Sequence, residues 1–106
     1  MSADQPLSML CTYVPKPGKE AELQRLLQAH GPTMIQLGLQ APGSSVVWKA
    51  TSRNGTVKFV ERMDWVNRQA PDLAHQHPAV MAMWEPIGAL CDSMDFSPVE
   101  VVAGAE

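Results

Sequence analysis

Four side chains that could take part in chemistry fall within residues 57–78 of the chain: Glu61, Trp65, His75 and His77. Over residues 57–65 apolar and polar residues alternate, which is typical of a β-strand with two unlike faces. Glu61 is the only charged residue on the apolar face, so its carboxylate must be paired, hydrogen-bonded, protonated or lining a cavity. Because a carboxylate and imidazoles can exchange protons with a bound molecule, we expect acid–base chemistry here.

The first half of the chain supplies the elements that position these residues. The hydrophobic pattern predicts a strand over residues 7–14 and a helix from 19 to 38, with a kink or a break at Gly31-Pro32. It then predicts strands over residues 44–51 and 56–65, which an Asn-Gly turn joins as a hairpin.

In the second half of the chain, apolar residues again recur at helical spacing. It predicts a helix over residues 70–77, a helix over 80–91 with a kink at Pro86, and a last strand over 96–102. Pro98 favours an edge position or a bulge for that strand. The order β-α-β-β-α-α-β is that of a split βαβ domain, in which an antiparallel four-stranded sheet carries helices on one face.

Such a sheet leaves its second face without a cover. Met9, Cys11 and Tyr13 alternate on the first strand, as the apolar residues of the third strand do. A second subunit laid sheet to sheet would bury the face that the helices leave open. Alternation alone does not say whether the odd-numbered or the even-numbered residues face the helices. The polar residues at the even-numbered positions of the third strand favour burial of the odd-numbered residues.

Composition narrows the class of protein. A chain of 106 residues with 45% hydrophobic content predicts one domain over residues 1–106 with a single core. The net charge is -3 and the eight basic residues are scattered, which argues against nucleic acid as a partner.

Without a signal peptide or a membrane-spanning stretch, we expect a cytoplasmic protein with no membrane partner. Cys11 and Cys91 lack metal-ligand spacing and are expected to be buried free thiols.

Segments spread over nearly the whole chain resemble the antibiotic biosynthesis monooxygenase domain: Tyr13-Val-Pro-Lys-Pro-Gly-Lys-Glu-Ala-Glu-Leu23, Gly38, Phe59-Val-Glu61, Trp65, and Ala74-His75 with His77-Pro78. The resemblance implies a ferredoxin-like α+β fold and a homodimer whose two sheets face each other as a dimeric α/β barrel. It also implies an oxidoreductase that acts on a small aromatic or quinone-type molecule and needs no cofactor.

The third strand carries both a match to this family and a departure from it. In the family's cofactor-free oxygenases an Asn and a Trp four positions apart face the cavity. Trp65 matches the Trp, whereas Glu61 stands in the place of the Asn. An ionised Glu only accepts hydrogen bonds and repels an anionic intermediate, whereas an amide can also donate. The Asn and the second Trp of haem-degrading relatives have no counterpart, which disfavours haem degradation.

Cofactor-free oxygenation of an aromatic molecule needs a base and a dry pocket. His75 is the first candidate for the base because imidazole takes up protons near neutral pH, and Glu61 is the second. Trp65 is expected to orient the substrate ring by stacking, as the third catalytic residue. Four further residues are expected to contact the substrate: Tyr13, Phe59, Met63 and His77.

Each residue also has a purely structural interpretation. His75 can be solvated, His77 can simply join two helices, and His30 on the apolar stripe of the first helix fits a core or interface histidine. Trp65 can anchor the core or a dimer. Glu61 can form an ion pair with one of three basic residues: Lys58, Arg62 or Arg53. No metal site is expected, because an i, i+2 spacing on a helix points two imidazoles apart.

Two functions therefore remain open. The chain is either a cofactor-independent monooxygenase for a small aromatic or quinone-type metabolite, or a non-catalytic small-molecule-binding or accessory dimer of the same fold. Trp65 and His75 favour the first. Glu61 in place of the family's Asn favours the second.

Overall fold

The predicted order of elements, β-α-β-β-α-α-β, is confirmed in the computed structural model, which describes residues 5–104. The elements are β1 (Leu7–Pro15), α1 (Glu20–Gln36), β2 (Val46–Thr51), β3 (Val57–Trp65), α2 (Ala70–Ala74), α3 (Pro78–Ala89) and β4 (Cys91–Pro98).

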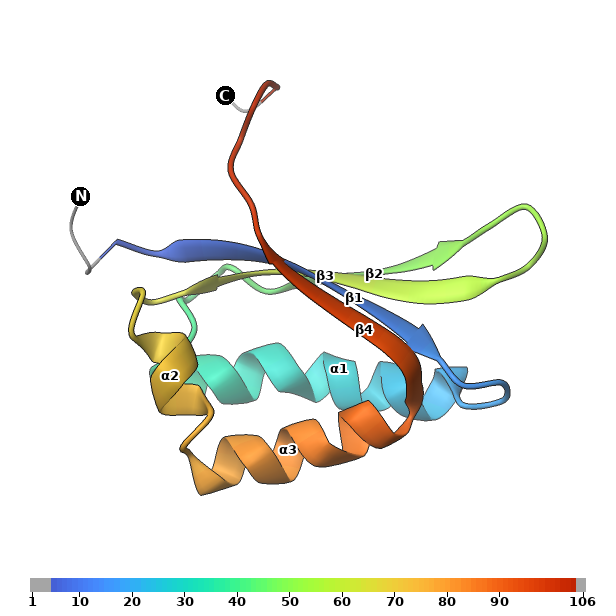
Figure 1. The fold of residues 1–106 in the computed structure, drawn as a ribbon, viewed down its shortest axis with the longest axis horizontal. Coiled ribbons are helices and arrows are strands. Elements are labelled where there is room, and N and C mark those ends of the chain that lie inside the picture. Colours follow the sequence, from blue (N-terminus) through green and yellow to red (C-terminus); the bar gives the residue numbers. More distant parts are fainter. Residues whose placement is uncertain (1–4, 105–106) are drawn as a thin grey trace.

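The strands form one antiparallel sheet in the order β2-β3-β1-β4, and the three helices lie against one of its faces (Figure 1). The fold class is therefore the predicted α+β, ferredoxin-like split βαβ arrangement. Within one chain the sheet is open, with β2 and β4 at its edges, and it does not close into a barrel.

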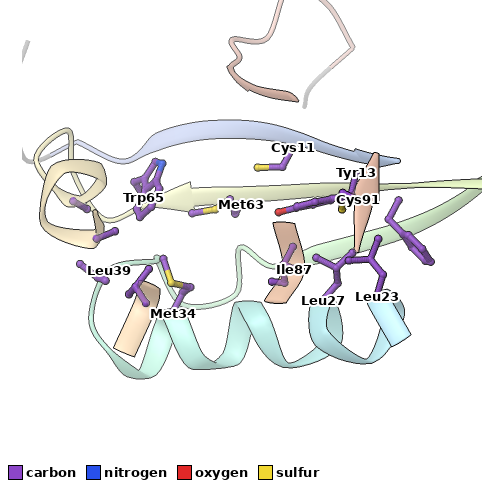
Figure 2. Packing of buried hydrophobic residues seen from close by; sticks show 14 residues of the cluster. Cys11, Tyr13, Leu23, Leu27, Met34, Leu39, Met63, Trp65, Ile87 and Cys91 are labelled. Carbon is purple, nitrogen blue, oxygen red and sulfur yellow. The ribbon is translucent and has the colours of Figure 1, made fainter. Parts of the chain in front are cut away.

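The register of the sheet answers the question that parity left open. Met9 of β1 lies opposite Met63 of β3, and Cys11 lies opposite Glu61, so the odd residues of both strands share one face. These odd residues are buried or, as for Met9, half-buried, and they point between the sheet and the helices, as Figure 2 shows for Cys11 and Met63. The even residues, such as Leu10, lie on the uncovered face.

The core forms where α1 packs beneath this buried face (Figure 2). Leu23, Leu27 and Met34 repeat at helical spacing and are almost fully buried. Each such side chain stabilises the fold by about 1.5–3 kcal/mol relative to its exposed state. The same face of α1 also buries His30, which brings one polar group into the core.

Helix α1 does not break at Gly31-Pro32, as the sequence predicted it could, but continues to Gln36. Gly31 is needed there for another reason. A Cβ at this position would lie 2.0 Å from Ser45 Oγ, so only glycine lets the helix approach the segment before β2 so closely. Helix α3 likewise continues through Pro86.

Several predicted boundaries in the second half of the chain were wrong. The last strand is Cys91–Pro98, not residues 96–102, and α3 ends at Ala89. Strand β4 has a neighbour on one side only, and residues 92–96 are exposed in one chain. Polar and apolar residues do alternate from Ser93 to Pro98, but the apolar helical spacing before the strand runs on to Cys91 and obscured its start. The strand ends at Pro98 because proline has no N–H to continue the ladder. Helix α2 is also shorter than predicted, since it ends at Ala74.

Candidate functional site

A cavity of about 410 Å³ lies between the sheet and the helices. Strands β1, β3 and β4 supply one wall, and all three helices contribute side chains to the other. Almost all of its lining is apolar, aromatic or sulfur-containing: Leu7, Met9, Cys11, Tyr13, His30, Met63, Trp65, Pro71, His75, Trp84, Ile87, Met94, Phe96 and Pro98. The volume is in the range of pockets that hold small organic molecules.

A chain of hydrogen bonds runs from β1 to α3 through three residues of this lining and through Glu61, which lies behind them. The Tyr13 hydroxyl donates to Glu61 Oε1 at 2.7 Å, and His30 Nδ1 lies 2.9 Å from Glu61 Oε2. On the far side of the imidazole, Trp84 Nε1 donates to His30 Nε2 at 2.9 Å. Glu61 is 0% exposed, so these contacts replace the water that its carboxylate loses on folding.

The hydrogen bonds assign the proton positions in this chain of groups. An indole N–H can only donate, so His30 Nε2 must be the acceptor and carries no proton. The proton of neutral His30 therefore sits on Nδ1 and is donated to Glu61. Tyr13 gives its proton to the other oxygen of the same carboxylate. Glu61 is thus an ionised carboxylate held by two neutral donors.

The negative charge of Glu61 acts on neighbouring groups of the cavity wall. Burial first, and the charge of Glu61 second, raise the pKa of the Cys11 thiol to about 12. The same two causes, in the same order, raise the pKa of the Tyr13 hydroxyl. Both groups therefore stay protonated, and Tyr13 faces the cavity as a neutral phenol whose proton is already donated to Glu61.

His75 is the group in the cavity wall that is best arranged to accept a proton. It follows α2 and is exposed in one chain, and its Nδ1 lies 2.7 Å from the carbonyl oxygen of Pro71. A carbonyl only accepts, so Nδ1 carries the proton, and the neutral ring has its free lone pair on Nε2. The imidazole also packs edge to face on Trp84, with ring centroids 5.1 Å apart.

Trp65 lies at the end of β3 and packs edge to face on the same Trp84, at 6.4 Å between ring centroids. Its Nε1 is buried and has no hydrogen-bond partner among residues 5–104. Buried donors normally have a partner, so this indole leaves one hydrogen bond unused beside the cavity.

The structure brings four of the seven predicted site residues to the cavity: Tyr13, Met63, Trp65 and His75. Glu61 and Phe59 lie behind the wall, and Phe59 is a core residue at 1% exposure. His77 does not line the cavity, because its Nδ1 accepts from the N–H of Ala79 at the start of α3. The ion pairs considered for Glu61 with Lys58, Arg62 or Arg53 do not form; Arg62 instead lies 4.0 Å from Asp64.

Sequence reasoning missed the roles of His30 and Trp84. His30 was assigned to the core or an interface, and it is buried, but it is also the partner of Glu61. The signal was available, because a carboxylate on a buried strand face needs a polar partner on the element packed against it. Trp84 gave no comparable signal, since Trp is ordinary on the apolar face of a helix.

Two classes of feature are not found in the described part of the chain. Residues 5–104 contain no cluster of three His, Cys, Asp or Glu side chains that could hold a metal ion. None of the described helices has the length and hydropathy to cross a membrane. Cys11 and Cys91 are buried free thiols, as predicted. The cytoplasmic location stays a prediction.

No family model matches the chain, and no curated protein matches it in sequence. Solved structures do match it. A conserved Bacteroides thetaiotaomicron protein of unknown function, described as a possible oxidoreductase, superposes with a TM-score of 0.74 at 9% identity over 93% of this chain and 100% of that chain. A variant of SnoaB, a cofactor-independent oxygenase from Streptomyces nogalater, superposes with a TM-score of 0.71 at 11% identity, over 94% of this chain and 96% of that chain. An antibiotic biosynthesis monooxygenase superposes with a TM-score of 0.70 at 15% identity, over 92% of this chain and 99% of that chain.

At these identities the likeness shows the fold alone. The chain has the fold of the antibiotic biosynthesis monooxygenases, as its sequence resemblance predicted. The chemistry has to be argued from the side chains of the cavity.

Proposed function

We propose that the protein is a cofactor-independent monooxygenase that acts on a small aromatic or quinone-type molecule. The observation that carries the proposal is His75, an imidazole in the wall of an apolar cavity whose Nδ1 proton is held by Pro71. This hydrogen bond leaves Nε2 as a base. The fold that the chain shares with a cofactor-independent oxygenase supports the same reaction class.

The proposed reaction begins when His75 Nε2 takes a proton from an acidic hydroxyl or C–H group of the substrate. The apolar lining offers the resulting anion few hydrogen-bond donors, which keeps it reactive toward O2. If the reacting carbon is a methylene between two rings, one oxygen atom becomes the oxygen of a new carbonyl. The other oxygen leaves as water with the two hydrogens, so no external reductant is consumed. Trp65 stacks on the substrate ring.

Oxygen uptake with a panel of anthrones and hydroquinones tests this proposal. We expect His75→Ala to slow uptake about 10²–10⁴-fold, the usual contribution of a positioned base. His77→Ala is the matched control, because this histidine lies two residues away and outside the cavity, and its uptake should equal that of the native protein. Native uptake no faster than the buffer rate, or equal loss in both variants, would contradict the proposal.

The second candidate is a non-catalytic small-molecule-binding or accessory protein, and Glu61 favours it. A buried negative charge behind the cavity wall raises the free energy of an anionic intermediate. Binding of the panel compounds without oxygen uptake would support this candidate instead.

We further propose that the protein forms a homodimer through the uncovered face of the sheet. Leu10 of β1 and Trp48 of β2 lie on this face and are 38% and 49% exposed. Residues 99–104 leave the sheet on the same side, and Val101 and Val102 are exposed there (Figure 1). Light scattering should report a dimer at micromolar concentration. Trp48→Glu should weaken association about 30-fold or more, as expected when a charge replaces a large aromatic side chain in an interface, and a native monomer would contradict the proposal.

A further inference from the structure

The ionised Glu61 behind the cavity wall has only neutral partners. Its contacts are the Tyr13 hydroxyl and the Nδ1–H of neutral His30. Among residues 5–104 no lysine or arginine lies within 4.0 Å of its oxygens, and Arg62 on the next position pairs with Asp64 on the opposite face of the sheet. The two hydrogen bonds give each carboxylate oxygen one partner, but they do not cancel the charge.

This charge is felt inside the cavity. Tyr13 and His30 contact the carboxylate on one side and line the cavity on the other, so a single layer of side chains separates the charge from a ligand. The charge of Glu61 also disfavours ionisation of Cys11 and Tyr13, two groups of the same wall. With little water between them, a carboxylate and a ligand charge interact more strongly than they would in bulk solvent.

The aromatic side chains of the lining also attract a positively charged ligand. Four aromatic side chains border the cavity: Tyr13, Trp65, Trp84 and Phe96. They are arranged in two edge-to-face pairs, with Tyr13 on Phe96 at 5.8 Å and Trp65 on Trp84 at 6.4 Å between ring centroids. The face of an aromatic ring attracts cations. In the described part of the chain, no lysine or arginine lines the cavity to oppose this attraction.

We propose that this cavity selects aromatic ligands that carry a positively charged nitrogen, such as a protonated amine, over neutral and anionic molecules of the same shape. The inference rests on the proposed function in taking the cavity as the substrate site, and it adds the charge class of the substrate. A cationic substrate also removes the conflict between Glu61 and base catalysis. When His75 takes a proton from such a molecule, the remaining species has no net charge, whereas a neutral substrate would become an anion.

Three probes of nearly equal shape test the proposal: 2-naphthylmethylammonium, 2-naphthylmethanol and 2-naphthoate. Their dissociation constants are measured at pH 7 and low salt by calorimetry or tryptophan fluorescence. We expect the ammonium to bind about tenfold more tightly than the alcohol, and the carboxylate to bind most weakly. Equal affinities, tighter binding of the carboxylate, or no binding of any probe would overturn the proposal.

Glu61→Gln, which removes the charge and keeps the shape, should reduce the preference for the ammonium over the alcohol to about twofold or less. Glu85→Gln is the matched control, because Glu85 is an exposed carboxylate of α3 that does not line the cavity, and it should keep the native preference. A Glu61→Gln protein that folds and keeps the full preference would also overturn the proposal. If Glu61→Gln does not fold, the order of the three probes on the native protein still decides.

This experiment is separate from the test of oxygenation. Preference for the ammonium without oxygen uptake would leave the charge selection intact and contradict the proposed reaction. Oxygen uptake with neutral substrates, together with equal binding of the three probes, would support the proposed reaction and contradict the charge selection.

Discussion

The two faces of the sheet are built by the same strands and differ in almost every physical respect. On the helix-facing side, Phe59 and Met63 are buried and Glu61 has a hydrogen bond on each carboxylate oxygen. On the uncovered side, Leu10 and Trp48 are exposed. One face completes its interactions within the chain, whereas the other leaves apolar area that a second molecule could bury.

The charged groups of the two faces differ in the same way. Glu61 is fully buried and belongs to a chain of four hydrogen-bonded side chains, so replacing one member leaves another without its partner. Arg62 and Asp64, the corresponding pair on the uncovered face, are 4.0 Å apart and the Arg side chain is half exposed. A pair at this distance with a half-exposed partner contributes little to stability. The polar groups that fix the structure of the site therefore lie on the helix-facing side.

The largest expected effect is on the packing of the helix-facing side. Phe59→Ala should lower the free energy of unfolding by about 3–5 kcal/mol, because it removes a fully buried ring and leaves a cavity. Leu10→Ala on the uncovered face should cost about 1 kcal/mol or less in the monomer. Urea unfolding of both variants at one protein concentration checks this. Equal losses would show that the two faces are not as different as their burial indicates.

A smaller effect is expected for the buried carboxylate. Glu61→Gln should lower the free energy of unfolding by about 1–3 kcal/mol, because the amide can accept from only one of the two donors, Tyr13 and His30. Asp95→Asn should stay within about 0.5 kcal/mol of the native protein. The two variants are compared by thermal and urea unfolding. A neutral or stabilising Glu61→Gln would mean that the hydrogen bonds of Glu61 do not hold this side of the sheet.

The smallest expected effect concerns alkaline pH. Burial raises the pKa of Cys11 from 9.0 to about 12, so above pH 9 the unfolded chain loses this proton and the folded chain keeps it. Stability then falls as pH rises, by up to about 1.4 kcal/mol per pH unit for this one proton, until about pH 12.

Cys11→Ala should therefore show a shallower loss of stability between pH 9 and 11 than the native protein. Urea unfolding at several pH values measures both slopes. Tyr13, whose pKa is also raised, contributes in the same direction above pH 10 in both proteins, so it cancels in the comparison. Identical slopes would contradict the buried state of Cys11.

The sequence was enough to predict the order of elements and the strand that carries Glu61 and Trp65, because these depend on local periodicity and turn residues. It did not locate the start of β4, although Met94 and Phe96 alternate with polar residues, because the apolar helical spacing before the strand runs on to Cys91. The hydrogen bonds of the site were also out of reach. They join Tyr13 to Glu61 across 48 positions, His30 to Glu61 across 31 and Trp84 to His30 across 54, which only the packing of α1 and α3 on the sheet determines.

The central claim is that the helix-facing side of the sheet holds an open aromatic binding cavity. Methionine methyl NMR tests it most directly, because Met9, Met63 and Met94 line the cavity and Met81 and Met83 do not. Addition of 2-naphthylmethylammonium should shift the first three methyl signals by the ring current of the ligand and leave the other two nearly unchanged. Shifts confined to Met81 and Met83, or no shifts at saturating probe, would contradict the claim.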